Sequence, residues 1–322
     1  MIGDSRLLAL DPRLVWSVLR SEVNPTTFIE SERLNRALQL KPGLLLVSET
    51  FQHTGSFKYR AALSVALHSQ SSHLLTASSG NFGAALALAA SRTGKRCTVV
   101  MPARSAQVKI RAVQDAGATV DLIDTNQISR AARIEQLRHA HPEAQVVSPY
   151  DDPYVVAGNS SLGAELFVRE VLDCVVVPVG GGGLSSGMVV ARDLLAKTCE
   201  VVGAEPLLAN DAARSLKSGK LCANEQEPNT LCDGARTLSL GKLNFAVLQQ
   251  GAAEIVEVDE GNIARAVRML FELANLKAEP TGALSLAAVL QAPGRFAGKR
   301  VACIVSGGNV DSALYAQLLL QH

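Results

Sequence analysis

The chain has 322 residues, enough for two ordinary domains or for one domain that carries a smaller insertion. Hydrophobic residues make up 48% and charged residues 19%, which predicts an extensive core and excludes a largely disordered chain. Lys and Arg together number 31 against 30 Asp and Glu, so the balanced charge argues against nucleic acid or an anionic membrane as the main partner.

The expected compartment follows from what the sequence lacks. The segment MIGDSRLLALDPRLVW has no basic head followed by an apolar core, and no apolar run approaches membrane-spanning length. The six cysteines are scattered without a CxxC pair, which is typical of reduced structural thiols. We therefore expect a cytoplasmic protein.

Short apolar runs alternate along the chain with longer segments of helical period. The expected strands are Leu44–Ser48, Leu74–Ser78, Cys97–Met101, Thr119–Ile123, Val146–Ser148, Cys174–Val179, Glu200–Ala204, Ile255–Val258 and Arg300–Val305. The expected helices include Lys58–Leu67, Phe82–Thr93, Ala106–Ala116, Ile128–His139, Gly163–Val171, Ser186–Lys197 and Asn262–Leu276. Apolar strands separated by helices are typical of an α/β protein with mostly parallel sheets covered on both faces.

Ligands of open α/β sheets lie beyond the carboxyl ends of the strands, so the strand-to-helix turns are the places to search. The first unusual segment is HTGSFKYR, in which Lys58 follows a turn of small residues near a helix start. The helix dipole and partial burial both favour the neutral amine that Schiff-base chemistry requires. An isolated lysine on a solvated helix face is the alternative.

The second segment, SSGNFG at residues 78–83, joins an expected strand to an expected helix. Its hydroxyls, glycine and free backbone N–H groups would form a cradle for a carboxylate or a ring oxygen. A plain helix cap made by Ser79 or Asn81 is the alternative.

The third segment places four consecutive glycines, Gly180 to Gly183, directly after the apolar strand CVVVPV. Their backbone amides would wrap a phosphate, with the dipole of the following helix pointing at it. The pattern is neither a Walker loop nor the spaced dinucleotide fingerprint.

The fourth segment, SGGN, follows the last expected strand. Ser306 would offer one neutral hydrogen bond to a ring nitrogen, whereas an aspartate would hold that nitrogen protonated. A glycine-rich turn with an Asn cap is the alternative.

In this order the four segments resemble the serine/threonine dehydratase and serine racemase family of fold-type II pyridoxal-phosphate enzymes. The resemblance runs from about residue 24 to residue 320 and includes MPARSAQVKIRAVQDAGATV, SPYDDPYVVAG, GAEPLLAND, LCDGARTLSLG and AEPTGALSLAA. It implies two domains, a large cofactor-binding one formed by residues 1–66 and 147–322 and a small inserted one formed by residues 67–146. It also implies a homodimer.

The resemblance implies a role for each matching residue. Lys58 would carry pyridoxal 5'-phosphate as a Schiff base and act as the base at the substrate Cα, and Ser79 would face it as a second catalytic group. The other residues implied to bind the cofactor are Phe57, Asn81, Gly180, Gly181, Gly182, Gly183, Gly234 and Ser306. Those implied to bind the amino acid substrate are Ser78, Ser79, Asn81, Phe82, Arg130 and Thr237.

Some relatives bind a cation at the positions that Glu205, Asp211 and the carbonyl of Ala209 occupy here. Two carboxylates and a carbonyl suit a hard ion such as Mg²⁺. A surface turn with two solvated acids is the alternative.

The activity expected from the resemblance is elimination of water from a 3-hydroxy amino acid (serine, threonine or a bulkier analogue), giving a 2-oxo acid and ammonia. Phe82 stands where many relatives have a histidine or a small residue, which favours a bulkier or apolar substrate such as phenylserine unless its ring points into the core. Ser79 is typical of racemising relatives, so amino acid racemisation is the second expectation. A β-replacement synthase and a non-catalytic cofactor carrier are weaker alternatives.

Overall fold

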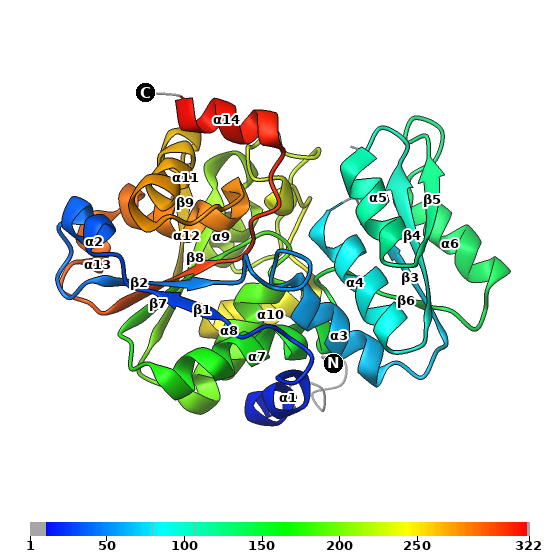
Figure 1. The fold of residues 1–322 in the computed structure, drawn as a ribbon, viewed down its shortest axis with the longest axis horizontal. Helices are drawn as coiled ribbons and strands as arrows, with labels where there is room; N and C mark the ends of the chain where they lie inside the picture. The colour runs from blue at the N-terminus through cyan, green and yellow to red at the C-terminus, as the bar shows by residue number, and fades with distance from the viewer. Residues whose placement is uncertain (1–10, 79, 106, 321–322) are drawn as a thin grey trace.

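The computed structural model describes residues 11–78, 80–105 and 107–320, which form two sheets (Figure 1). The larger sheet has the strand order β1-β2-β10-β7-β8-β9. Its strands are β1 (Thr27–Ile29), β2 (Leu44–Ser48), β7 (Cys174–Pro178), β8 (Glu200–Pro206), β9 (Glu254–Val258) and β10 (Val301–Val305). All pairs are parallel except β1 with β2, and β10 lies between β2 and β7.

The smaller sheet is fully parallel, with the strand order β5-β4-β3-β6. Its strands are β3 (His73–Ala77), β4 (Arg96–Pro102), β5 (Thr119–Ile123) and β6 (Gln145–Val146). The sheet therefore lies within the expected insertion at residues 67–146, whose limits stay a prediction. The predicted α/β fold with mostly parallel sheets is confirmed.

Helices cover both faces of the larger sheet because successive side chains of its buried strands point to opposite sides. Leu44 and Leu46 of β2 join one core cluster, and Leu45 and Val47 join another. The first cluster includes side chains of α2 (Glu32–Leu38), α11 (Glu260–Ala274), α12 (Pro280–Gln291), α13 (Pro293–Phe296) and α14 (Ser312–Leu320). The second includes α7 (Pro153–Arg169), α8 (Gly183–Leu195), α9 (Asp211–Ser218) and α10 (Lys242–Gly251).

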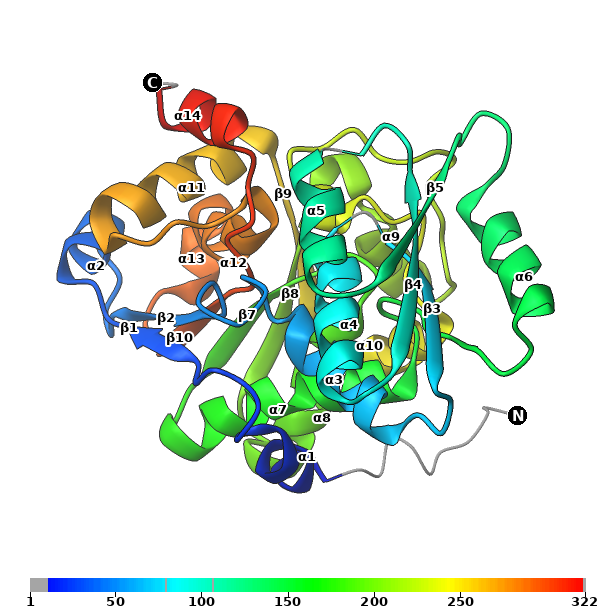
Figure 2. The same cartoon turned by 45° about the vertical axis from the view of Figure 1, so that its right-hand side comes forward.

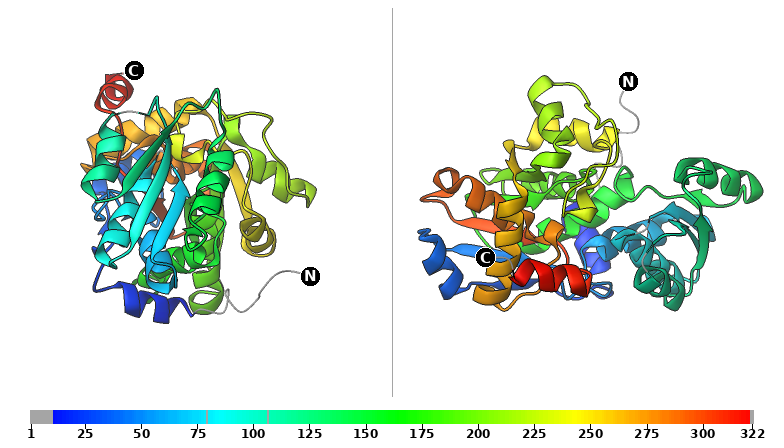
Figure 3. Two further views of the ribbon diagram at one scale, coloured as in Figure 1. Left: turned by 90° about the vertical axis from the view of Figure 1, so that its right-hand side faces the viewer. Right: turned by 90° about the horizontal axis from the view of Figure 1, so that it is seen from above.

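The smaller sheet is covered in the same way. α4 (Asn81–Arg92) and α5 (Gln107–Asp115) pack on the face toward the larger sheet, together with α1 (Pro12–Leu19) and α3 (Lys58–His68) (Figure 2). α6 (Arg130–Ala140) covers the opposite face and forms the far end of the molecule (Figure 3). Two 3-10 turns, η1 (Leu207–Ala209) and η2 (Asp233–Ala235), complete the described elements. None of the helices described is long and apolar enough to cross a membrane.

Helix α7 begins ten residues before the predicted start at Gly163. Asp152 caps it by accepting hydrogen bonds from the backbone N–H groups of Tyr154 and Val155, and Pro153 occupies the first turn. Gly158 lies in its interior because a Cβ there would come within 2.5 Å of the carbonyl oxygen of Arg60 in α3. The polar run at residues 158–161 therefore serves the contact between two helices.

The contact between α3 and α7 contains a charge that is fully removed from solvent. The Arg60 side chain is 0% exposed, and its Nε donates to Glu49 Oε2 at 2.9 Å. Its Nη2 donates to Glu165 Oε2 at 2.7 Å and to Thr26 Oγ1 at 2.8 Å. Every partner is itself buried, so the group joins the turn after β2 to both helices.

We expect Arg60→Met to lower the free energy of unfolding by about 3–5 kcal/mol, because it leaves two buried carboxylates without their cation. Arg169→Gln is the matched control, since Arg169 also pairs with Glu165 but is 47% exposed, and its loss should cost less than about 1 kcal/mol. Urea unfolding of the holoenzyme measures both. Equal losses in the two variants would contradict the assignment.

Candidate active site

Lys58 is the first residue of α3, and its side chain is half-buried. Its Nζ donates to the carbonyl oxygen of Pro149 at 2.9 Å and lies 4.9 Å and 5.7 Å from the ring centroids of Phe57 and Phe82. Burial lowers the pKa of Lys58 to about 8, although the nearby Glu279 acts in the opposite direction. The amine is therefore far more available as a nucleophile and base than that of a surface lysine.

Backbone pairing brings the turn before Lys58 against the segment that follows β10. Phe57 N donates to Ser306 O at 2.9 Å, and Gly308 N donates to Gly55 O at 2.9 Å. Ser56 forms an antiparallel bridge with Gly307 between these two bonds. The HTGSFKYR and SGGN segments are thus neighbours, and Ser306 is buried beside the turn that precedes Lys58.

Asn81, at the start of α4, belongs to a chain of polar contacts that includes Glu279 and Asn309 of the SGGN segment. Its Nδ2 donates to Glu279 Oε1 at 2.8 Å, and its Oδ1 accepts from Asn309 Nδ2 at 3.0 Å. Burial raises the pKa of Glu279 to about 8, and the charge of Asp233 adds to this effect. At neutral pH the carboxyl group is therefore mostly protonated.

The sequence reasoning gave no role to Glu279 or Asn309. Both lie in segments that carry the resemblance, AEPTGALSLAA and SGGN, and an acid preceding an apolar helical run was an available signal for Glu279. The contacts show that these two side chains orient Asn81.

The four glycines form the turn between β7 and α8, whose first residue is Gly183. Gly182 has φ +90°, a conformation that only glycine adopts readily. A Cβ on Gly181 would lie 2.2 Å from the ring of Tyr150, and Asn244 Nδ2 fixes the turn by donating to Gly181 O at 2.7 Å. The turn thus presents backbone N–H groups and the amino terminus of α8 to a ligand, and side chains at these glycine positions would not fit.

Gly234 of η2 lies against the glycine turn, because a Cβ on Gly180 would be 2.8 Å from the carbonyl oxygen of Gly234. Its own N–H donates to Thr281 Oγ1 at 3.1 Å. The predicted cofactor residues Gly180 and Gly234, from two distant parts of the chain, are therefore packed together, although their contacts with a cofactor stay a prediction.

The predicted substrate residues are placed differently. Ser78 Oγ accepts from Gly83 N at 3.2 Å, so it caps α4 while its own hydrogen stays available. Ser79 lies outside the described residues. Phe82 is 2% exposed and belongs to the core beneath α4, yet its ring also faces Lys58 Nζ. Its contact with substrate stays a prediction.

Arg130 lies outside this group of contacts, at the start of α6, where it lines a cleft of about 450 Å³. The cleft is lined by Pro102, Arg104, Ser105, Lys109, Thr125, Ser129, Arg130 and Glu227. Lys109 Nζ crosses from α5 to Asp233 Oδ2 at 2.9 Å, and Arg130 is 3.7 Å from Glu227. Arg104, Lys109 and Arg130 outnumber the two acids that pair with them, Asp233 and Glu227, so the cleft keeps a positive charge that attracts anions.

Thr237 lies beyond η2, on the side of the predicted cation site. Its Oγ1 is buried without a partner, and its carbonyl oxygen accepts from Asn224 Nδ2 at 3.4 Å. The same Asn224 nitrogen donates to Asp211 Oδ1 at 2.9 Å. Contact of Thr237 with substrate stays a prediction.

Glu205, at the end of β8, and Asp211, at the start of α9, are each 1% exposed, so they are not the solvated acids of a surface turn. Glu205 accepts hydrogen bonds from the N–H groups of Ala212 and Ala213 at 2.9 Å. Asp211 Oδ2 has no partner, and burial raises the pKa of Asp211 to about 6. Ala209, between them, is buried in η1.

The donor set fits a phosphorylated carbonyl cofactor. A lysine amine with a lowered pKa stands beside two aromatic rings, a glycine turn with a helix amino terminus is suited to a phosphate, and Asn81 and Ser306 offer neutral polar contacts. Fold and site together define a lysine-dependent enzyme with a cofactor site at the carboxyl ends of parallel strands.

Comparison with known proteins agrees with this class. Residues 19–307 match the family described as "Pyridoxal-phosphate dependent enzyme". The chain is 34% identical to the L-threo-3-hydroxyaspartate ammonia-lyase of Saccharomyces cerevisiae (94% of this chain, 93% of that protein). It is 32% identical to the serine racemase of Schizosaccharomyces pombe (94% of each). The crystal structure of a T.th. threonine deaminase superposes with a TM-score of 0.88 at 36% identity (94% of this chain, 98% of that one).

The chain therefore belongs to the pyridoxal-phosphate-dependent enzymes, and the predicted family is confirmed. The predicted cofactor and the enzyme class, a pyridoxal-phosphate-dependent lyase, are confirmed with it.

The lowered pKa of Lys58 makes the uptake of cofactor dependent on pH. Only the neutral amine reacts with an aldehyde, so the rate of pyridoxal-phosphate uptake by the apoenzyme should rise with pH and level off above about 8. Stopped-flow absorbance measures this rate. Glu279→Gln should move the midpoint to lower pH, because the Glu279 carboxyl group is partly ionised near pH 8 and its charge raises the pKa of Lys58. A midpoint near 10.5, the ordinary lysine value, would contradict the assignment.

Proposed function

We propose that the enzyme is a 3-hydroxy amino acid ammonia-lyase whose preferred substrate carries a second carboxylate, as 3-hydroxyaspartate does. The observation that carries this preference is the cationic cleft of Arg104, Lys109 and Arg130. A phenylserine-type substrate has no second anion for such a cleft. The similarity to the L-threo-3-hydroxyaspartate ammonia-lyase of yeast covers nearly the whole chain and supports the same substrate preference.

Pyridoxal phosphate, when bound, supplies the electron sink that makes the Cα–H bond of an amino acid acidic. Lys58 Nζ is the group that takes the Cα proton, because it is the buried amine with the lowered pKa. The amino terminus of α4, with the hydroxyl hydrogen of Ser78, is suited to hold the α-carboxylate. Loss of the 3-hydroxyl as water gives an enamine product, and hydrolysis of its imine form by one water yields a 2-oxo acid and ammonia.

Glu279 is mostly protonated at neutral pH, so it orients Asn81 without placing a negative charge near Lys58. Ser306 is a neutral neighbour of the lysine turn, so it would not hold a ring nitrogen in its protonated form. A ring nitrogen without a proton stores less negative charge, which favours prompt loss of a β-substituent.

The activity is tested by measuring 2-oxo acid and ammonia release from threo-3-hydroxyaspartate, L-serine, L-threonine and 3-phenylserine. We expect the highest kcat/KM with threo-3-hydroxyaspartate, because its β-carboxylate would be attracted to the cations of the cleft, Arg130 among them. Arg130→Gln should lower that kcat/KM by about 10- to 100-fold and leave the value for L-serine within a few-fold. Arg138→Gln, which removes an exposed cation paired with Glu135 on the same helix, is the control.

Release from L-serine alone, or equal loss with both substrates in Arg130→Gln, would contradict the β-carboxylate contact. Absence of release from every substrate would contradict the proposed substrate class.

Racemisation is the second candidate, favoured by the serine at position 79 and by the similarity to the serine racemase of Schizosaccharomyces pombe. Chiral analysis of the substrate recovered from the same assay tests it. D-isomer that disappears in Ser79→Ala while elimination continues would support Ser79 as the second base.

We also propose that Glu205, Asp211 and the Ala209 carbonyl bind a hard divalent cation. The unpartnered, buried Asp211 Oδ2 supports this proposal, because a cation would satisfy it. Glu205 lies close to the start of α9, where Asp211 is, because its carboxylate accepts hydrogen bonds from Ala212 N and Ala213 N.

A cation must compete with protons for these acids, so the increase in melting temperature caused by Mg²⁺ or Ca²⁺ should grow as pH rises through about 6. Differential scanning fluorimetry between about pH 5 and pH 8 measures it. Asp211→Asn should abolish the increase, and Asp193→Asn, at an exposed acid, should not. An increase that is equal at both ends of the pH range would contradict the site.

We propose a cytoplasmic homodimer as the working form. All six cysteines are free and five are buried, which suits a reducing compartment. Light scattering on the holoenzyme tests the dimer.

A further inference from the structure

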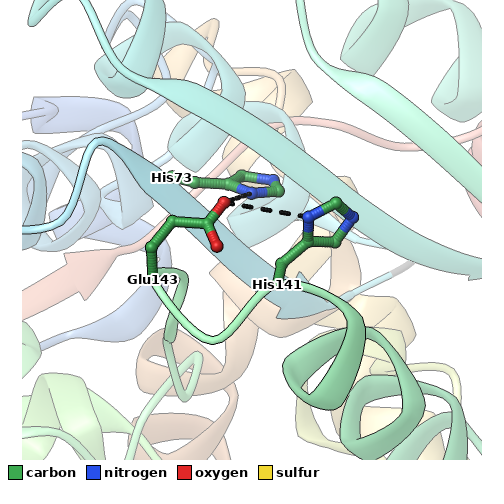
Figure 4. Close-up of side chains that lie close together, drawn as sticks. All are labelled: His73, His141 and Glu143. Atoms are coloured by element: carbon green, nitrogen blue, oxygen red, sulfur yellow. Dashed lines mark ion pairs between the residues drawn. The ribbon is translucent and has the colours of Figure 1, made fainter.

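Two histidines and a glutamate lie close together beside the smaller sheet, at the end of β3 that is farther from the active site. His73 is the first residue of β3, while Ser78 follows its last residue, so about 16 Å of strand separates the two places. His141 and Glu143 lie in the connection between α6 and β6. Figure 4 shows one oxygen of the Glu143 carboxylate facing both imidazole rings, whose centroids are 5.2 Å apart.

The three side chains present one ligand atom each at a common point. Glu143 Oε1 lies 3.9 Å from His73 Nδ1 and 3.7 Å from His141 Nδ1. All three ligand atoms lie within 4.8 Å of one another. Ligand atoms around a tetrahedral Zn²⁺ are about 3.4 Å apart, so a small inward movement would complete such a geometry.

The buried member of the group has an unused ring nitrogen. The His73 side chain is 5% exposed, and its Nδ1 is buried without a hydrogen-bond partner. Its other nitrogen, Nε2, lies 2.9 Å from Thr98 Oγ1 in β4. When Nε2 donates to Thr98, the lone pair of Nδ1 points at the other two ligands. Metal-binding histidines are commonly oriented in this way by a hydrogen bond from their other nitrogen.

The protonation state of His73 suits a ligand. Burial lowers the pKa of His73, which favours the neutral imidazole that metal coordination requires.

One cation competes for the carboxylate. Arg96 Nη2 lies 3.0 Å from Glu143 Oε1, but both side chains are about half exposed, so this ion pair costs little to break. His141 and Glu143 are also partly exposed, which lets them move toward the fixed His73. Ser71 Oγ lies within 2.8 Å of the carbonyl oxygens of His73 and Glu143 and holds their backbones side by side.

We propose that His73, His141 and Glu143 form a binding site for Zn²⁺ or a neighbouring first-row divalent ion, separate from the active site. Two imidazoles and one carboxylate favour such an ion over Mg²⁺ or Ca²⁺, which prefer oxygen ligands alone. The ion would join the start of β3 to the segment before β6, which is only two residues long. It would thereby clip the edge of the smaller sheet.

The site is tested by equilibrium dialysis of the holoenzyme against Zn²⁺, with excess Mg²⁺ present to fill any site of oxygen ligands. We expect one Zn²⁺ per chain, with affinity lowered at least about 100-fold by His141→Asn or Glu143→Gln, since loss of an outer partner alone costs about 10- to 100-fold. Thr98→Val should give that smaller loss, because it removes only the partner of Nε2. Elimination activity should be unchanged in all three variants.

His139→Asn is the matched control, because His139 is exposed on α6 two residues before His141 and pairs with Glu135. Zn²⁺ affinity that is equal in wild type, His141→Asn and Glu143→Gln would overturn the proposal, as would absence of Zn²⁺ binding by the wild type. The visible spectrum of the Co²⁺ form should show tetrahedral bands without a thiolate band. A thiolate band would place the ion on a cysteine such as Cys222 instead.

Discussion

The guanidinium of Arg60 has no exposed surface, and two carboxylates hold it there. Glu49 comes from the turn after β2, and Glu165 comes from α7, which follows the smaller sheet in the sequence. A buried charge of this kind is costly unless every partner is in place, so it fixes α3 relative to both elements. Because Lys58 lies only two residues before Arg60, the direction of the reactive amine depends on this group.

The contacts around Lys58 explain how a cofactor site arises from segments that are far apart in the chain. The turn at Gly55 to Phe57 pairs with the segment that follows β10, and Pro149 accepts a hydrogen bond from the amine. Asn81 reaches the same place from the smaller sheet through Glu279. The amine thus lies between the two sheets, with a lowered pKa and a neutral carboxyl group nearby.

Sequence reasoning predicted the α/β fold from short strand-forming runs, and two of them, Leu44–Ser48 and Thr119–Ile123, become strands with the same bounds. It missed the start of α7, because the polar run at residues 158–161 has no helical pattern and its small residues are set by the approach of α3. The motifs of Lys58 and the glycine turn could be recognised from the sequence, because an amine and a run of glycines themselves indicate Schiff-base formation and phosphate binding. The role of Glu279 depends on burial, and that of His73 on residues about 70 positions away, so neither could be read from local sequence.

The central position of β10 has a consequence for how the enzyme is made. The smaller sheet is contiguous in sequence, so it can form while the chain is still being synthesised. The larger sheet cannot, because β10 lies between β2 and β7 and is synthesised after both of them. Ser306 and its pairing with the lysine turn follow that strand directly. A nascent chain therefore stays without a competent cofactor site until β10 and Ser306 have been translated.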